Sequence, residues 1–239
     1  MKEIPVDSFE EFHKQIAKYN GRITVYRGVK HEEYDLRPRI GRVKLRKPAQ
    51  FEREERGILR WFIERSIPYL TFEPTDEWEW LTLAQHHGLP TRLLDWTRNP
   101  LIAAYFAVEK SHSKEESEQY SGNSAVYVFR TPKLISRGDL SSPNQVYQGG
   151  PFACSKAAKY APAHIDNRII VQSGVFTIHP DPYDPFPFPP QNLNKIIIPN
   201  KIRRQWKKIL HNYGINRVSL FPDLDNLANH IEWLRTKSF

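Results

Sequence analysis

The chain has 239 residues and a formal net charge of +8, because 35 Lys and Arg outnumber 27 Asp and Glu. At about 100–200 residues per domain, this length allows one large domain or two small ones. Hydrophobic residues make up 39% of the chain, enough for a buried core, so the composition excludes a disordered polymer. No segment reaches the ~18–20 consecutive apolar residues that a membrane helix needs.

Two features of the sequence indicate the compartment. Residues 1–5 lack the basic and then apolar pattern of a secretory signal. Cys154 is the only cysteine, which excludes an intramolecular disulfide and a multi-cysteine zinc site and fits a reducing environment. We therefore expect a cytoplasmic protein without a membrane partner.

The positive charge favours anionic partners such as nucleic acid or nucleotide phosphates, although a charged soluble surface explains a moderate excess equally well. The densest basic cluster lies in residues 38–48, which lack a helical or strand period and predict a loop. This loop is either a solvated, mobile surface or part of a nucleic-acid-binding surface. Its basic residues are Arg39, Arg42, Lys44, Arg46 and Lys47.

Helix signals dominate the first half of the chain. Ser8 and Glu11 form a capping-box pattern, and Asn99, followed by a proline, is a strong helix start. The β-branched residues of 22–27 predict a strand that ends at Gly28. The expected helices cover residues 8–19, 49–67, 77–87 and 99–108.

The second half mixes loops, strands and helices. The polar residues 109–122 predict an exposed loop. In residues 168–178, Ser173 and Gly174 interrupt two apolar runs, which indicates one bent strand or a hairpin. Residues 179–190 contain six prolines and three aromatic residues, and we expect them to pack along the surface in extended form. Further strands are expected at residues 124–130 and 195–198, and further helices at residues 200–213 and 223–235.

This irregular order of elements predicts an α+β fold, in a single domain over residues 1–239, with flanking helices and a mixed or antiparallel sheet. The G-x-S-x-G, Walker, G-x-G-x-x-G and H-E-x-x-H motifs are absent. His86 and His87 are adjacent, so they point to different sides of a helix and cannot clasp one metal ion. We expect no metal site.

The most informative segment is residues 83–107, which places polar side chains between two helices. A mixture of polar and bulky apolar side chains is expected where a polar ligand meets an apolar wall. An internal ion pair between Arg92 and Asp95, together with helix capping by Thr97 or Asn99, would explain part of this polarity structurally. The polar side chains are those of Gln85, His86, His87, Thr91, Arg92, Asp95 and Thr97, and the bulky ones are Leu93, Leu94 and Trp96.

Three groups of residues resemble the FRG domain family. They are Val-Tyr-Arg-Gly at 25–28, Gln-His-His-Gly-Leu-Pro-Thr-Arg-Leu-Leu-Asp-Trp-Thr at 85–97 with its continuation to residue 107, and Arg168 with residues 172–176. The resemblance runs in order along nearly the whole chain, with Tyr26 a small departure from the family's aromatic-x-Arg-Gly signature. The family has bacterial, phage and defence-associated members, so the resemblance implies a toxin or an anti-phage defence effector.

More distantly, the order of motifs resembles the ADP-ribosyltransferases of the arginine-serine-glutamate class. This resemblance implies a split sheet, a strand that leads into the helix after Asn99, and NAD as a substrate. It also implies roles for single residues. Arg27, between Tyr26 and Gly28, would hold a phosphate or ribose of NAD, for which an always charged guanidinium fork is suited.

The same resemblance places further NAD-binding groups in residues 86–97. Thr97 would fix the nicotinamide ribose, and Trp96 would stack on the nicotinamide. Arg92 would bind a second phosphate. His86 or His87 would contact the ribose or assist proton transfer near neutral pH.

Gln172 stands where the resemblance places the catalytic glutamate. A carboxylate stabilises the positive charge that develops on the ribose as nicotinamide leaves, whereas a neutral amide orients the 2′-hydroxyl but contributes little charge. Either Asp95 supplies the missing charge, or the domain retains NAD or nucleotide binding without rapid chemistry.

Two functions of different classes follow from the sequence. The first is an NAD-binding ADP-ribosyltransferase-like domain that modifies a protein or a nucleic acid, with Arg27, His87, Asp95 and Gln172 as its catalytic residues. The alternative is a non-catalytic nucleic-acid- or nucleotide-binding module that uses residues 39–47 and the basic face of the helix around residues 201–208.

Overall fold

The structure is a computed structural model that describes residues 1–19, 21, 23–109, 122–130, 134–135, 149–162 and 170–236. Within these residues one sheet contains the strands β1 (Lys2–Pro5), β2 (Thr24–Val29), β3 (Leu93–Thr97), β4 (Ser124–Arg130), β5 (Leu134–Ile135), β6 (Ala158–Tyr160), β7 (Gly174–Ile178) and β8 (Leu193–Ile198). The helices are α1 (Phe9–Ile16), α2 (Phe51–Ser66), α3 (Glu77–His86), α4 (Pro100–Val108), α8 (Arg203–Asn212), α9 (Arg217–Leu220) and α10 (Leu224–Thr236).

The strands follow the order β1-β8-β4-β2-β3-β7-β6-β5. The pairs β1–β8 and β5–β6 are parallel, and the neighbouring pairs between them are antiparallel. The predicted α+β class, with a mixed sheet and flanking helices, is therefore confirmed. Among the described residues, no helix is both long enough and apolar enough to cross a bilayer.

Backbone pairing in the sheet is weakest between β2 and β3. These two strands share a single register pair, Tyr26 with Thr97, whereas β2 pairs with β4 along its whole length and β3 does the same with β7. The predicted split of the sheet is thus incomplete, because one continuous sheet is present. Its two halves are nevertheless joined by very little backbone pairing.

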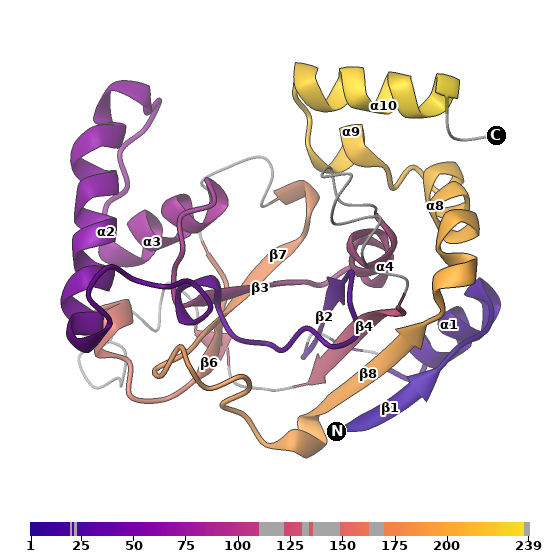
Figure 1. Cartoon of the computed structure of the whole chain (residues 1–239), viewed down its shortest axis with the longest axis horizontal. Helices are drawn as coiled ribbons and strands as arrows, with labels where there is room; N and C mark the ends of the chain where they lie inside the picture. Colours follow the sequence, from indigo (N-terminus) through magenta and orange to yellow (C-terminus); the bar gives the residue numbers. More distant parts are fainter. Residues whose placement is uncertain are drawn as a thin grey trace.

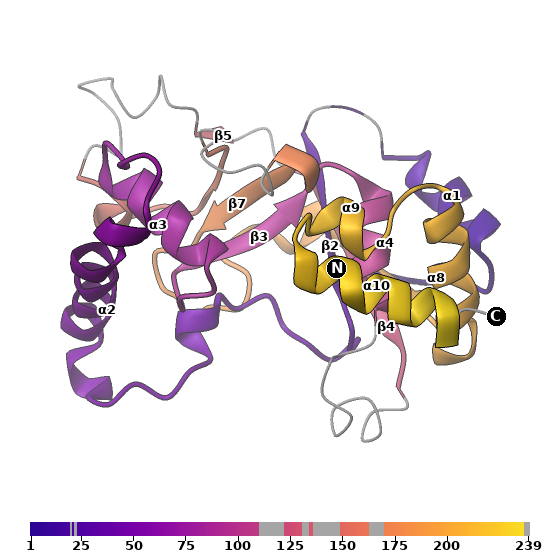
Figure 2. The same cartoon turned by 90° about the horizontal axis from the view of Figure 1, so that it is seen from above.

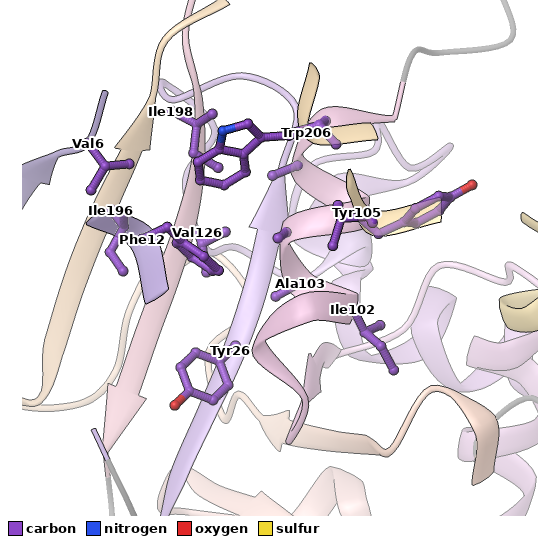
Figure 3. Close-up of a cluster of buried hydrophobic side chains, with 14 of the residues drawn as sticks. Val6, Phe12, Tyr26, Ile102, Ala103, Tyr105, Val126, Ile196, Ile198 and Trp206 are labelled. Atoms are coloured by element: carbon purple, nitrogen blue, oxygen red, sulfur yellow. The ribbon is translucent and has the colours of Figure 1, made fainter. Parts of the chain in front are cut away.

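Helices cover one face of both halves. At one end of the molecule, α1, α4 and α8 pack on β2, β4 and β8 through a cluster that includes Phe12, Tyr26 and Trp206 (Figure 3). At the other end, α2 and α3 pack on β3, β6 and β7 through a second cluster (Figures 1 and 2). Segments without regular structure cover the opposite face. There Phe186 and Phe188 pack against a third apolar cluster, which includes Trp96 and Phe129. These two contacts confirm that the segment 179–190 packs on the rest of the protein, but its predicted extended form is interrupted by a turn at residues 181–184.

The close approach of α4 to β2 depends on Gly28. A Cβ atom at this position would lie 1.9 Å from the Ala103 carbonyl oxygen and 2.7 Å from the Ala107 nitrogen. Ala103, Ala104 and Ala107 are fully buried at the same interface, so small residues on both elements bring the backbones together. Gly28 thereby places α4, and the strand β3 that precedes it, beside β2.

The structure differs from the residue-based predictions in several places. The strands β1, β5 and β6 and the short helix α9 were not predicted, and β2 continues through Gly28 to Val29. Residues 93–97 form β3. The residue pattern alone predicted only a polar segment between two helices, whereas the resemblance implied a strand here. Residues 170–171 are helical, and the strand begins only at Gly174, after Ser173 has turned the chain with a φ of 49°. Arg168 and most of the predicted loop, residues 110–121, lie outside the described residues.

The substitution Gly28→Ala tests this packing. We expect it to lower the free energy of unfolding by about 3 kcal/mol, because the added methyl group overlaps the backbone of α4. Gly57→Ala in α2 is the matched control: nothing lies within 4 Å of its Cβ position, and Ala favours a helix over Gly by about 1 kcal/mol. Urea denaturation of both variants measures the difference, and equal stabilities would contradict the interpretation.

Candidate functional site

Arg27 occupies the place where β2 and β3 separate. It directly follows Tyr26, the only β2 residue in register with β3. Its Nη1 donates a hydrogen bond of 2.7 Å to the carbonyl oxygen of Asp95 and lies 3.6 Å from Asp95 Oδ2. In a regular antiparallel ladder a backbone N–H would bond such a carbonyl. The Arg27 guanidinium therefore links the two halves of the sheet and brings a positive charge to their boundary.

The environment of Arg27 is costly for a cation. Burial lowers the pKa of its guanidinium; Asp95 opposes this shift and Arg42 adds to it. Its Nε is buried without a hydrogen-bond partner in the described part of the chain. The guanidinium still remains charged at neutral pH, because the ordinary pKa of arginine is above 12. Arg27 is thus a charge that its surroundings within the protein compensate only in part.

A relay of hydrogen bonds orients the carboxylate of Asp95. Gln85 Nε2 donates to both carboxylate oxygens, at 3.1 and 3.0 Å. The Gln85 Oε1 accepts a 2.6 Å bond from the Thr91 hydroxyl, which in turn accepts from the Leu93 N–H at 3.1 Å. Each partner determines the direction of the next bond, so the amide of Gln85 must present its NH₂ group to Asp95. The carboxylate is held in place yet is 57% exposed.

Arg27 and Asp95 line a cavity of about 190 Å³. Arg39 reaches it from the short 3₁₀ helix η1 (Arg39–Gly41), where its Nη1 donates to the Gly88 carbonyl. Arg42 follows η1 directly. The cavity thus combines three guanidinium groups with one carboxylate, on a wall that is partly apolar. The complete lining is Arg27, Arg39, Arg42, Gln85, Gly88, Leu89, Leu93, Leu94 and Asp95.

Sequence reasoning placed Gln85 in the polar segment and Arg39 and Arg42 in a basic loop, but it assigned none of the three to the NAD site. Their arrangement depends on contacts between segments far apart in the chain. The N–H of Ile40 donates to the Thr91 carbonyl at 3.2 Å, which holds η1 beside the entrance to β3. Only Gln85 gave a usable signal in the sequence. It lies ten residues before Asp95 in the same polar segment, a separation short enough for the two side chains to meet when the chain turns between α3 and β3.

The two histidines lie beside the cavity and do not line it. His86 ends α3, and His87 follows it with its ring centroid 5.0 Å from that of His86. The His87 ring is exposed, and its centroid is 6.5 Å from that of Phe62 on α2. Gly88, the next residue, belongs to the lining.

Arg92 is held in a buried ion pair. Its Nε donates to Glu55 Oε1 at 2.9 Å and its Nη2 donates to Glu55 Oε2; the two side chains are 5% and 2% exposed. The guanidinium also donates to the Pro180 carbonyl at 3.3 Å and lies over the ring of Phe152. Arg92 thus pairs with Glu55 and not with Asp95, and in this way it joins β3 to α2.

The remaining predicted NAD-binding side chains are engaged within the protein. The Trp96 indole is buried and donates to the Thr177 hydroxyl at 3.0 Å. The Thr97 hydroxyl donates to the Gln172 carbonyl at 2.7 Å and accepts from the Asn99 N–H. The Gln172 amide donates to the Leu220 carbonyl at 3.0 Å, and the Tyr26 hydroxyl donates to the Tyr19 carbonyl at 3.1 Å. Gln172 is therefore tied to α9 rather than to the cavity lining.

The two basic clusters that the sequence suggested lie in different places. Arg39 donates a hydrogen bond to the carbonyl of Gly88, just after α3. The helix α8 instead packs against α4, at the end of the molecule opposite α2 and α3 (Figures 1 and 2). In the described residues, no group of three or more His, Cys, Asp or Glu side chains is placed to hold a metal ion. Burial raises the pKa of Cys154 to about 12, so its thiol stays protonated near neutral pH.

Comparison with known proteins identifies one family. Residues 22–116 match the FRG domain, which confirms for this part of the chain the resemblance seen in the sequence. The match includes β2, β3, α4 and every residue of the cavity lining, whereas Gln172 lies outside it. Neither the comparison with curated proteins nor that with solved structures found a match to the chain.

The ion pair of Arg92 predicts a loss of stability that is unrelated to ligand binding. Arg92→Gln leaves the buried Glu55 carboxylate without its partner, and we expect it to lower the free energy of unfolding by about 3–5 kcal/mol. The double variant Glu55→Met with Arg92→Met should recover most of this loss, because no buried charge remains. Arg53→Gln, at an exposed position of α2, is the control. Unchanged unfolding of Arg92→Gln in urea would show that the pair has no structural role.

Proposed function

We propose that this protein binds NAD at the junction of β2 and β3 and transfers its ADP-ribose group to a protein or a nucleic acid. The observation that carries the proposal is the position of Arg27, whose guanidinium lies in the gap between the two strands, 3.6 Å from the carboxylate of Asp95. An anion-binding group and an acid thus meet at an opening in the sheet.

The side chains around the cavity fit the chemistry of NAD. A dinucleotide carries two linked phosphates, and arginine forks bind phosphate oxygens through paired hydrogen bonds. The cavity of about 190 Å³ is smaller than the ~300–1,000 Å³ of pockets that enclose a whole ligand. We therefore expect it to take the phosphates, while the nicotinamide ribose lies at its opening beside the exposed carboxylate of Asp95 and the adenosine lies outside along the surface.

Asp95 is our candidate for the catalytic carboxylate. NAD supplies a ribose carbon that gains positive charge as its bond to nicotinamide breaks, and a fixed carboxylate lowers the energy of that state. The amide of Gln172 carries no charge and is bonded to Leu220, whereas Asp95 is exposed and oriented by Gln85. The preorganised hydrogen bonds of Asp95 match what electrostatic stabilisation requires.

His87 is the candidate for accepting a proton from the acceptor group. It is exposed and precedes Gly88 of the cavity lining. Imidazole is the side chain that most often accepts a proton in general base catalysis. Because the side chains of Trp96, Thr97 and Arg92 are occupied by other contacts, the proposal assigns them to the support of β3.

The biological role that fits such an activity is that of an effector, a toxin or a phage-defence protein, which modifies a macromolecule of another cell or of a virus. Mass spectrometry of protein and nucleic acid incubated with isotope-labelled NAD would identify the acceptor. If label is bound but not transferred, the same pocket belongs to a nucleotide-binding module without chemistry.

Two substitutions separate binding from chemistry. We expect Arg27→Gln to weaken NAD binding by about 10- to 100-fold, because a charge-assisted hydrogen bond to phosphate is lost. We expect Asp95→Asn to slow nicotinamide release by about 100-fold or more while NAD affinity changes little. Isothermal titration calorimetry and an assay of released nicotinamide measure the two effects.

Lys44→Gln is the control for both, because Lys44 is exposed in the same segment as Arg39 but does not line the cavity. Circular dichroism establishes whether each variant is folded. If Arg27→Gln does not fold, Arg27→Lys replaces it, because lysine keeps the positive charge but lacks the guanidinium fork. Folded wild-type protein that fails to bind NAD, or an Arg27→Gln variant that binds it as well as wild type does, would refute the proposal.

A further inference from the structure

Arg39 and Arg42 are presented by a firmly packed segment and not by a mobile loop. Ile40, between them, is fully buried and is bonded through its N–H to Thr91. Gly41 packs closely on the proline-rich segment 179–190: a Cβ atom at position 41 would lie 1.9 Å from the Pro182 carbonyl oxygen. Of the solvated, mobile surface that was one interpretation of residues 38–48, the solvent exposure holds for Arg39 and Arg42, whereas the backbone at Ile40 and Gly41 is packed on both sides.

The cavity carries more positive charge than the protein itself compensates. Arg27, Arg39 and Arg42 contribute three positive charges to the lining, and Asp95 contributes the one negative charge, which leaves an excess of two. Arg42 lies near enough to Arg27 to lower its pKa, so the two guanidinium groups repel each other.

Asp35 faces Arg42 from outside the lining, but its carboxylate is already engaged. Asp35 Oδ2 accepts a hydrogen bond of 2.6 Å from Nε of Arg37, and Nη2 of Arg37 forms an ion pair with the same oxygen, also at 2.6 Å. In the described part of the chain, the Arg42 guanidinium makes no hydrogen bond or ion pair of its own. Cations that a rigid backbone brings together without anions are destabilising until a ligand supplies the missing negative charge.

We propose that Arg39 and Arg42 complete, with Arg27, a site for two linked phosphate groups, and that the cavity therefore selects nucleotides that carry two linked phosphates over nucleoside monophosphates. The diphosphate bridge of a dinucleotide carries two negative charges, which match the excess of two. A single phosphate group carries a similar charge near neutral pH, but it offers fewer oxygens than a diphosphate to the three guanidinium forks. The inference rests on the same cavity as the proposed function, but it does not require the transfer reaction.

The number of arginines also suits the geometry of a diphosphate. Each planar guanidinium can bind two phosphate oxygens in parallel, and the oxygens of a diphosphate point in several directions from one small group. Arg27 approaches from the strand gap and Arg39 from beside Gly88, while Arg42 is contributed by the end of η1. The limited volume of the cavity, about 190 Å³, fits a compact diphosphate better than a sugar and base together.

Calorimetric titration of the full chain with ADP, AMP, pyrophosphate and inorganic phosphate tests the proposal. We expect wild-type protein to bind ADP at least tenfold more tightly than AMP, and pyrophosphate more tightly than phosphate. Arg42→Gln should weaken ADP binding by about tenfold and AMP binding by much less, because it removes one charged phosphate contact. Arg39→Gln with Arg42→Gln should abolish the preference for ADP, and Lys44→Gln should leave it intact.

Equal binding of ADP and AMP by wild-type protein, or an unchanged preference in the folded double variant, would overturn the inference. Arg42→Gln is the cleaner single variant, because Arg39 also supports the backbone at Gly88. The assay of nicotinamide release keeps the two proposals apart. Arginine-dependent ADP binding without nicotinamide release refutes the transfer reaction alone, and nicotinamide release without a preference for ADP refutes the diphosphate site alone.

Discussion

The structure depends on how the two halves of a sheet are held together where their backbones separate. β2 and β3 share one register pair, and beyond it the guanidinium of Arg27, instead of a backbone amide, reaches the carbonyl of Asp95. Placing a charged group there costs desolvation energy, and Asp95 offsets only part of it because its carboxylate is more than half exposed and therefore screened. The gap that weakens the backbone pairing is thus also the place where a mostly buried cation meets solvent.

A comparison of two arginines shows why this position differs from an ordinary structural ion pair. Arg92 and Glu55 are almost completely buried and form two direct hydrogen bonds, so the ion pair is satisfied within the protein and joins α2 to β3. Arg27 is 20% exposed, has an Nε without a partner in the described structure, and lies beside a second guanidinium. The resemblance gave both arginines a phosphate-binding role, and their surroundings favour that role for Arg27.

How much could be predicted from the sequence depended on how local each signal was. The capping patterns at Ser8 and Asn99 correctly predicted the starts of α1 and α4, because a cap is formed within one turn of the helix. The strand β3 escaped the residue pattern because Asp95 interrupts its apolar run, and its partner β7 lies about 80 residues further along the chain. The cavity could not be predicted, since it forms only when η1 packs beside Thr91 and Arg39 reaches Gly88.

The location of the positive charge carries more information than its total. An excess of eight positive charges over the chain says little about partners, because exposed lysines and arginines are solvated and screened by salt. The helix α8 lies beside α4, at the end of the molecule opposite α2 and α3, so the basic residues of the chain are distributed over separate elements (Figures 1 and 2). Around Arg27 the arrangement is more specific, because the packed backbone of η1 brings the exposed side chains of Arg39 and Arg42 to the same cavity as Arg27. A group of arginines whose backbone is already ordered loses less conformational entropy when an anion binds than the same residues on a flexible segment would lose.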